Sequence, residues 1–244
     1  MPIVSRAGTS ANTLPPKWFS RLRTRHLKKL GHLACLDMKE WRFRAIYYKY
    51  RRHTMVRWTS YVGNLRLASQ VAGVEGCIVE CGTWRGGMIA GIADVLGSWR
   101  SYYLCDSYAG LPPAKKIDGD AALKWQADTS GAAYFDNCAA SEDDARSAMA
   151  MSAARDYTIL KGWFAETLPQ FPQVPIALLR MDADWYESTK CILENLGPRV
   201  VPGGLILIDD YYTWEGCAVA VNEFAARNKW RIRQNRYGVC YIAL

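Results

Sequence analysis

From about residue 74 onward, short apolar runs alternate with segments whose apolar residues recur at helical spacing. Each run has four to six residues, which is the length of a buried strand. The intervening segments include MIAGIADVLGSW, SEDDARSAMAM and AVAVNEFAARN. Strands that alternate with helices predict βαβ units, and therefore an α/β fold with a mostly parallel sheet covered on both faces. The seven expected strands span residues 77–81, 102–105, 157–160, 176–181, 205–208, 231–234 and 239–243.

The two ends of the chain differ from this central pattern. The last two runs follow one another around Tyr237-Gly238, which predicts a hairpin and an antiparallel last strand. At the other end, residues 17–50 are basic and helical in pattern, and a second helix is expected over about 58–71. We therefore expect two parts, a basic N-terminal extension over residues 1–53 and a main domain over residues 54–244.

The net charge of +8 is distributed unevenly along the chain. Residues 1–60 contain 14 Lys and Arg and two acids, whereas residues 61–244 contain 17 Lys and Arg and 21 acids. A basic chain favours nucleic acid, anionic lipid or a phosphorylated ligand as its partner, but here only the N-terminal segment carries that charge. No RNA-recognition, KH or zinc-finger signature is present, which disfavours nucleic acid. The alternatives for the basic segment are a helix packed on the main domain, a peripheral membrane contact, and steering of a phosphorylated acceptor.

Cysteine usage and the N-terminal sequence bear on the cellular compartment. The eight cysteines include no CxxC pair and no Cys/His spacing typical of zinc. Several lie in apolar runs, where a free thiol packs as a small hydrophobic group, so we expect a reducing, cytoplasmic compartment. The first 20 residues lack the apolar core of a signal peptide, although the Arg-rich N-terminal region, with no acid before Asp37, loosely fits an organelle transit peptide. No stretch approaches the roughly 18 apolar residues of a membrane span.

Residues that directly follow the expected strands are candidates for ligand binding, because ligands in such sheets bind beyond the carboxyl ends of the strands. The segment ECGTWRGG matches neither the dinucleotide fingerprint nor a P-loop, but its glycines let backbone N–H groups approach a ligand. An acid there suits a cationic, hydroxyl-rich ligand such as S-adenosylmethionine (SAM), and Asp106 is placed to accept hydrogen bonds from ribose hydroxyls. Ordinary turn and helix packing is the alternative explanation for the glycines. The cofactor candidates are Glu80, Gly82, Thr83, Trp84, Gly86, Gly87, Asp106, Ser107, Gly162 and Trp163.

Four aspartates follow two expected strands that lie side by side. Asp182 and Asp184 follow residues 176–181, and Asp209 and Asp210 follow residues 205–208. Carboxylates that converge without a nearby Lys repel one another, and a hard divalent cation such as Mg²⁺ relieves that repulsion. We predict metal ligation by Asp182, Asp209 and Asp210, and the direction of the Asp184 side chain stays open. The alternative is that these acids cap the helices that follow.

A cation beside a sulfonium donor suggests methyl transfer to an oxygen. Two vicinal oxygens of the substrate would chelate the cation, which lowers the pKa of the hydroxyl. A carboxylate takes the proton, and positioning of oxygen, methyl and sulfur in line supplies much of the rate. Asp182 is the candidate base, and Asp184 is the alternative because a ligated carboxylate is a poor base. Tyr211, Tyr212 and Trp214 follow the acids and either stack on a sugar ring or pack in a loop.

Six motifs, in this order along the chain, resemble the macrocin O-methyltransferase family. They are VECGTWRGG, DSYAGLPP, SEDDAR, LKGWFAETLP, LLRMDADWYEST and GGLILIDDY, within roughly residues 54–226. Members of that family methylate sugar hydroxyls of macrolide and aminocoumarin antibiotics with SAM and Mg²⁺. The resemblance implies a Rossmann-like methyltransferase fold, metal ligation by Asp182, Asp209 and Asp210, and Asp182 as the base. It also implies that Thr54-Met55 and Asn64-Leu65 form a lid over SAM, with Met55 at the cofactor. Such a lid would exclude water from the methyl transfer.

The chain departs from the family pattern at three places. Ala109 stands where relatives usually carry a charged or larger residue, residues 115–137 do not match, and the basic first 50 residues are atypical. These differences concern the acceptor rather than the reaction class. We therefore expect a SAM- and Mg²⁺-dependent O-methyltransferase that acts on a sugar hydroxyl of a glycoside, glycan or natural product. Because members of the family often form oligomers, the resemblance also implies a homo-oligomer. The alternative is a binding protein whose basic N-terminus docks on a membrane or nucleic acid and whose pocket is not catalytic.

Overall fold

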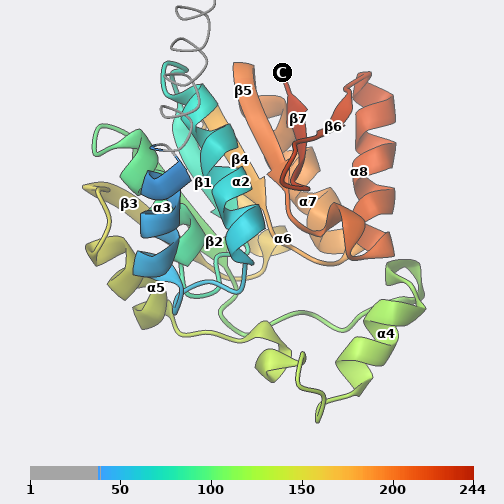
Figure 1. Ribbon diagram of the computed structural model, residues 1–244. Coiled ribbons are helices and arrows are strands. Elements are labelled where there is room, and N and C mark those ends of the chain that lie inside the picture. The colour runs from blue at the N-terminus through green and yellow to red at the C-terminus, as the bar shows by residue number, and fades with distance from the viewer. Residues whose placement is uncertain (1–37, 39) are drawn as a thin grey trace, which may run out of the picture. The chain divides into compact units, whose positions relative to one another are not determined.

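The computed structural model describes residue 38 and residues 40–244, and a seven-stranded sheet forms their centre (Figure 1). The spatial order is β3-β2-β1-β4-β5-β7-β6, and all neighbouring strands are parallel except for the two pairs that involve β7. The predicted mostly parallel sheet with an antiparallel last strand is confirmed. The strands are β1 (Cys77–Cys81), β2 (Ser101–Asp106), β3 (Asp156–Lys161), β4 (Ile176–Met181), β5 (Val200–Ile208), β6 (Ile232–Gln234) and β7 (Cys240–Ala243).

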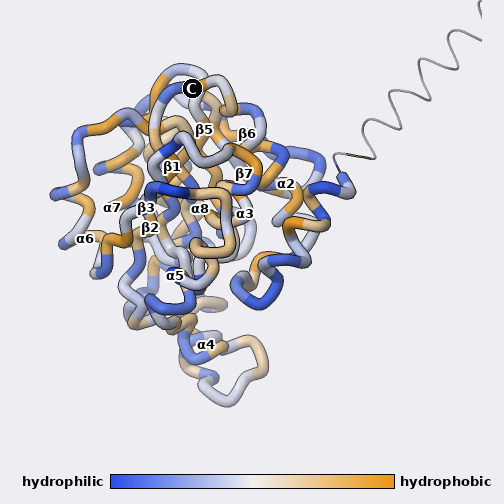
Figure 2. The backbone as a smooth tube through the Cα atoms, turned by 90° about the vertical axis from the view of Figure 1, so that its left-hand side faces the viewer, coloured by the Kyte–Doolittle hydropathy of each residue, from blue (hydrophilic) through white to orange (hydrophobic). Residues whose placement is uncertain are grey.

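Helices cover both faces of this sheet. The α-helices are α2 (Trp58–Ala68), α3 (Gly87–Leu96), α4 (Asp120–Ala127), α5 (Glu142–Ala150), α6 (Phe164–Thr167), α7 (Tyr186–Leu196) and α8 (Glu215–Asn228). Short 3₁₀ helices are η1 (Ser69–Val71), η2 (Lys116–Asp118), η3 (Phe135–Cys138), η4 (Leu168–Gln170), η5 (Gly197–Arg199) and η6 (Asp210–Tyr212). Along α2, α6 and α7, hydrophobic and hydrophilic residues alternate in Figure 2, as expected for helices packed on a sheet.

The core forms two hydrophobic clusters, one on each face of the sheet. Ile78 of β1 packs in one cluster with residues of α2, α3 and α5, whereas Val79 packs in the other with residues of α7 and α8. Successive side chains of a strand point to opposite faces, so one strand supplies both clusters. Every residue of β1 and β4 is buried. This explains why both strands appear in the sequence as uninterrupted apolar runs.

The N-terminal predictions lie mostly outside the described residues, which include only the end of the expected basic helix. Residues 43–244 form one compact unit. Residues 43–50 are helical, and Phe43, Ile46 and Tyr50 are buried in the core of this unit. The Tyr50 hydroxyl donates to Asp94 Oδ2 (3.0 Å). The boundary expected between residues 53 and 54 stays a prediction.

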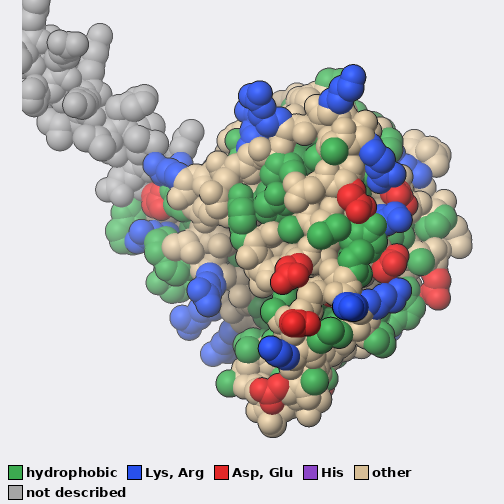
Figure 3. Space-filling view, turned by 90° about the vertical axis from the view of Figure 1, so that its right-hand side faces the viewer, with side chains coloured by type: hydrophobic (Ala, Val, Ile, Leu, Met, Phe, Trp, Pro, Cys, Tyr) green, Lys and Arg blue, Asp and Glu red, His purple; other side chains and the backbone are tan. Residues whose placement is uncertain are grey.

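Several features bear on partners and compartment. Among the described helices, none is long and apolar enough to cross a membrane. The seven described cysteines are all free of disulfide bonds, and a cytoplasmic location stays a prediction. On the face of the molecule in Figure 3, acidic and basic side chains are largely interspersed with hydrophobic ones. A nucleic-acid-binding face would instead carry mainly basic groups.

Candidate active site

The turn between β1 and α3 is anchored by the acid at the end of β2. Asp106 Oδ2 accepts hydrogen bonds from the backbone N–H groups of Thr83 and Trp84 (both 2.8 Å), and its Oδ1 accepts from Tyr108 N (2.7 Å). These bonds fix the loop after β1 relative to the next strand. The Thr83 side chain also interacts with this carboxylate. A carboxylate has about four lone-pair sites, so a further donor, such as a ribose hydroxyl, would share or replace one of these contacts.

Gly82 lies where this turn meets the loop after β4. Its φ is +82°, and a Cβ atom there would lie 1.7 Å from the carbonyl oxygen of Asp182. Only glycine combines that backbone conformation with that close approach. Gly82 therefore allows the turn to lie directly against the acid-bearing loop.

Gly86 and Gly87 have a packing role in this structure. A Cβ at Gly86 would lie 3.0 Å from Ala145 Cα, and one at Gly87 would lie 2.5 Å from the carbonyl oxygen of His53. Gly87 N–H donates to that same oxygen (2.8 Å). Both glycines thus allow other segments of the chain to approach the start of α3.

A cavity of about 320 Å³ lies beyond the carboxyl ends of β1, β2, β3 and β4. It brings together seven of the predicted cofactor residues, namely Met55, Gly82, Trp84, Asp106, Ser107, Gly162 and Trp163. Glu80, Thr83, Gly86 and Gly87 do not line it. Asn64 and Leu65, which were expected in a lid, are buried within α2, whereas Met55 is 41% exposed. The direct cofactor roles of these residues stay predictions.

Beneath this cavity lies a fully buried guanidinium that pairs with acids from three adjacent strands. Arg180 Nη1 donates to Glu80 Oε1 (2.7 Å) and to Asp182 Oδ2 (3.0 Å), and Arg180 Nη2 pairs with Asp209 Oδ1 (2.8 Å). Arg180 and Glu80 side chains are each 1% exposed. Burial raises the pKa of Glu80 to about 8, although the neighbouring guanidinium opposes the shift. One cation thus offsets part of the negative charge at the ends of β4 and β5.

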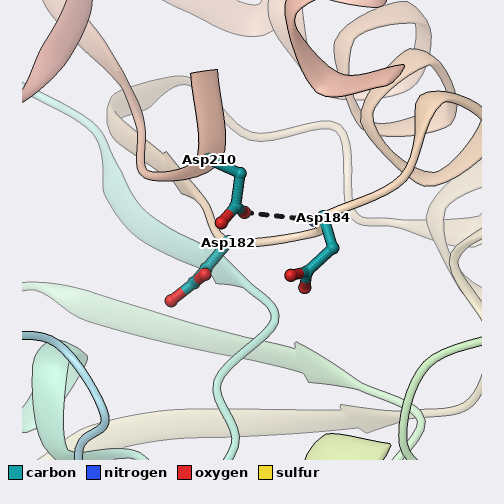
Figure 4. A group of neighbouring side chains, drawn as sticks. All are labelled: Asp182, Asp184 and Asp210. Atoms are coloured by element: carbon teal, nitrogen blue, oxygen red, sulfur yellow. Dashed lines mark hydrogen bonds between the residues drawn. The ribbon is translucent and has the colours of Figure 1, made fainter. Parts of the chain in front are cut away.

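The side chains of three aspartates lie close together (Figure 4), and two of them, Asp182 and Asp184, line the cavity. Oxygens of Asp182, Asp184 and Asp210 all lie within 4.8 Å of one another, and Asp184 N–H donates to Asp210 Oδ2 (3.1 Å). We call these three residues the acid cluster. Burial raises the pKa of Asp182 to about 6 and that of Asp184 to about 8, and nearby carboxylates add to both shifts. The pKa of Asp210 is also raised, first by burial and then by Asp184.

The acid cluster differs in one member from the predicted ligand set. Asp182 and Asp210 were predicted and are present, but the third carboxylate is Asp184. Asp209 instead directs Oδ1 toward Arg180. The backbone of Asp184 has a φ of +56°, an unusual value for a non-glycine residue that sequence cannot reveal.

An aromatic group next to the acid cluster orients Asp184. Trp214 Nε1 donates to Asp184 Oδ1 (2.8 Å), and the Trp214 ring packs edge-on against Trp185 with centroids 5.2 Å apart. Trp125 of α4 packs against both rings, at 6.1 Å from Trp185 and 5.9 Å from Trp214. The atypical segment 115–137 therefore reaches the site through Trp125.

The sequence of the chain matches a known family. The sequence profile described as Macrocin-O-methyltransferase (TylF) matches residues 52–236. The chain belongs to the macrocin O-methyltransferase family. It is therefore a SAM-dependent O-methyltransferase, as the motifs predicted.

Individual relatives support the same assignment. The demethyldecarbamoylnovobiocin O-methyltransferase of Streptomyces niveus is 36% identical over 162 residues, which cover 63% of this chain and 60% of that enzyme. An 8-demethyl-8-(2,3-dimethoxy-alpha-L-rhamnosyl)-tetracenomycin-C 4'-O-methyltransferase of Streptomyces olivaceus is 32% identical, over 72% of this chain and 68% of that enzyme. Among solved structures, the O-methyltransferase NovP superposes with a TM-score of 0.66 at 30% identity, over 78% of this chain and 81% of that one.

Sequence reasoning missed Arg180, and its signal was present. It is the one charged residue in the apolar run IALLRM, two positions before Asp182. Residues two apart in a strand point to the same face, so a guanidinium at 180 extends under a carboxylate at 182. The prediction considered only a nearby Lys, and the cation beside the acids is Arg180 instead.

Replacing Gly82 with Ala is expected to weaken binding of S-adenosylhomocysteine (SAH) at least tenfold, measured by titration calorimetry. The added Cβ meets backbone rather than a flexible side chain, so the turn or the loop after β4 must move. Gly203→Ala is the matched control, because Gly203 has a φ of +83° but its Cβ would meet only Val74 at 3.5 Å. SAH affinity of Gly82→Ala equal to that of Gly203→Ala would contradict this role.

Proposed function

We propose that this enzyme transfers the methyl group of SAM to a sugar hydroxyl, with a divalent cation held by the acid cluster. The observation that carries the proposal is the convergence of three carboxylates within 4.8 Å at the edge of the cofactor-sized cavity. Carboxylate oxygens are the ligands that Mg²⁺ prefers. When bound, the cation would act as a Lewis acid that lowers the pKa of the acceptor hydroxyl.

The electrostatics of the acid cluster fit a cation. Burial and mutual repulsion raise the pKa values of all three members, so the ionised cluster is unfavourable by itself. The ion pairs of Arg180 join it to Glu80, Asp182 and Asp209, and not to Asp184 or Asp210. The cluster therefore retains uncompensated charge on the side away from the guanidinium, where a cation would bind.

The cavity fits a nucleoside with a cationic centre. Asp106 lines the cavity with a carboxylate that accepts hydrogen bonds, and Trp163 is 40% exposed, which leaves ring surface for a base to pack against. Asp182 lies at the same cavity and supplies negative charge toward a sulfonium. SAM would supply the activated methyl group.

Of the two candidate bases, the surroundings favour Asp184. Asp182 Oδ2 accepts two hydrogen bonds from the Arg180 guanidinium (3.0 and 3.1 Å), which lowers its basicity. Asp184 accepts one from a neutral indole, and burial raises its pKa to about 8 in the absence of a cation. Ligation would lower the pKa of both aspartates, and Asp184, without a guanidinium partner, would remain the more basic of the two. The acceptor oxygen would bond to the methyl carbon as the carbon–sulfur bond breaks. The electron pair would go to sulfur, and Asp184 would accept the hydroxyl proton.

The relatives indicate the acceptor class. One is named for the 4'-hydroxyl of a rhamnosyl group, and a third, from Micromonospora griseorubida, is named as a mycinamicin III 3''-O-methyltransferase. We propose by similarity that this chain methylates a hydroxyl of a deoxyhexose attached to a natural product or other small molecule.

The metal part of the proposal predicts a pH-dependent stabilisation by Mg²⁺. The pKa of Asp184 is about 8 in the folded chain against an ordinary 3.8. Between these values the folded state binds more protons than the unfolded state, so without metal the free energy of unfolding decreases as pH rises. Mg²⁺ competes with those protons, so its stabilising effect should increase with pH.

We expect the rise in Tm on adding Mg²⁺ to be larger at about pH 8.5 than at about pH 6, measured by differential scanning fluorimetry against EDTA. Asp210→Asn should reduce the rise at the higher pH, and Asp143→Asn, on the exposed start of α5, should leave it unchanged. The absence of a Mg²⁺ effect at pH 8.5 in the unmodified chain would refute ligation by the acid cluster.

A further inference from the structure

A second cavity, of about 470 Å³, lies beside the first and has no role in the account so far. Met55 lines both cavities, so they are adjacent across one side chain. The polar residues that line the second cavity come from the start of α2, the end of β5 and the segment that follows β5. They are Arg57, Ser60, Asp209, Tyr212 and Thr213.

The two cavities occupy neighbouring positions along the carboxyl edge of the sheet. Asp182 at the end of β4 lines the first, and Asp209 at the end of β5 lines the second. Both pair with the guanidinium of Arg180, through Asp182 Oδ2 (3.0 Å) and Asp209 Oδ1 (2.8 Å). The acid cluster draws its members from these same two strand ends. Asp182 and Asp184 line the first cavity, and Asp210 directly follows Asp209, which lines the second.

The chemistry of the second cavity suits a polyol. Its walls offer a guanidinium, aliphatic hydroxyls, a phenol and a carboxylate, which together donate to and accept from sugar hydroxyls. Tyr212 is 56% exposed, so its ring face is available to pack against the C–H face of a pyranose. Asp209 keeps Oδ2 without a bond to Arg180, whereas its Oδ1 is paired.

In-line methyl transfer requires the acceptor oxygen opposite the leaving sulfur, with its proton near a base. With SAM in the first cavity, an acceptor in the second cavity would lie across Met55 from it, beside the strand end that carries Asp209 and Asp210. We propose that the second cavity binds the pyranose ring of the acceptor, with Tyr212 under the ring and Arg57, Ser60 and Asp209 on its hydroxyls. This inference rests on the function proposed above.

The experiment fills the second cavity and measures both ligands separately. Ser60→Trp places an indole in the second cavity, and Thr59→Trp adds the same group at an adjacent exposed position that lines neither cavity. SAH binding is measured by calorimetry. Sugar binding is measured by saturation-transfer NMR with methyl α-L-rhamnopyranoside in the presence of saturating SAH.

We expect Ser60→Trp to weaken sugar binding at least tenfold while the SAH dissociation constant stays within about twofold, and Thr59→Trp to change neither. Tyr212→Ala, which removes an exposed ring and leaves the core intact, should weaken sugar binding several-fold with unchanged SAH affinity. Sugar binding retained in both Ser60→Trp and Tyr212→Ala, or absent in the unmodified chain while SAH binds, would overturn the inference. Failure of the unmodified chain to bind SAH would instead refute the proposed function.

Discussion

Asp184→Asn is expected to lower kcat about 10²–10⁴-fold, the usual contribution of a general base, with little change in SAH affinity. The amide has the shape of the carboxylate and its oxygen can still accept from Trp214 Nε1, so the fold of the loop is retained. The amide cannot take the hydroxyl proton. Measured against pH, kcat of the unmodified enzyme should rise as the base ionises, and this rise should be absent in the variant.

Two further substitutions make this expectation specific. Asp182→Asn should weaken Mg²⁺ binding, as Asp184→Asn should because both are proposed ligands, yet it should keep the rise of kcat with pH. Asp143→Asn serves as the exposed control and should behave as the unmodified enzyme. If the rise with pH disappears in Asp182→Asn and persists in Asp184→Asn, the base is Asp182, as first predicted from the sequence.

Arg180→Met is expected to lower the free energy of unfolding by about 3–5 kcal/mol, because it leaves buried carboxylates without their cation. Glu80 is the most affected partner, since both side chains are 1% exposed and 2.7 Å apart. The measurement is urea unfolding followed by circular dichroism at about pH 9, above the pKa of about 8 of Glu80, so that its carboxylate is ionised.

The double variant Glu80→Gln/Arg180→Met should recover part of this loss, because it removes the buried charge that the single variant leaves unpaired. Arg227→Met is the matched control. Arg227 is 59% exposed and lies 3.5 Å from Glu194, so its pair contributes at most about 1 kcal/mol. A loss for Arg180→Met no larger than that of Arg227→Met would show that Arg180 does not hold the acids.

The fold was largely predictable because strands that are buried on both faces appear in the sequence as short apolar runs. The runs 77–81 and 176–181 coincide with β1 and β4, both of which are buried along their whole length. The start of β5 was not predictable. It begins at Val200 rather than 205, and the segment Pro202-Gly203-Gly204, with a register shift opposite Ile176–Leu178, has the composition of a turn.

The site residues that directly follow a strand were predictable from the sequence. Residues whose place in the site depends on a tertiary contact or on an unusual backbone angle were less predictable. Asp182 and Asp210 lie in the acid cluster because they end neighbouring strands. Asp184 joins them through a positive φ, and Trp214 orients it from a distance of 30 residues along the chain. Neither feature has a local sequence signal. Arg180 did have a local sequence signal, because residues two positions apart in a strand, such as 180 and 182, point to the same face.

The most direct test of the account is a crystal structure of the chain with SAH and Mn²⁺, collected at a wavelength where manganese scatters anomalously. The account predicts SAH in the first cavity and one anomalous peak in contact with oxygens of Asp182, Asp184 and Asp210. SAH bound elsewhere, or Mn²⁺ absent from these three carboxylates in the presence of SAH, would contradict it.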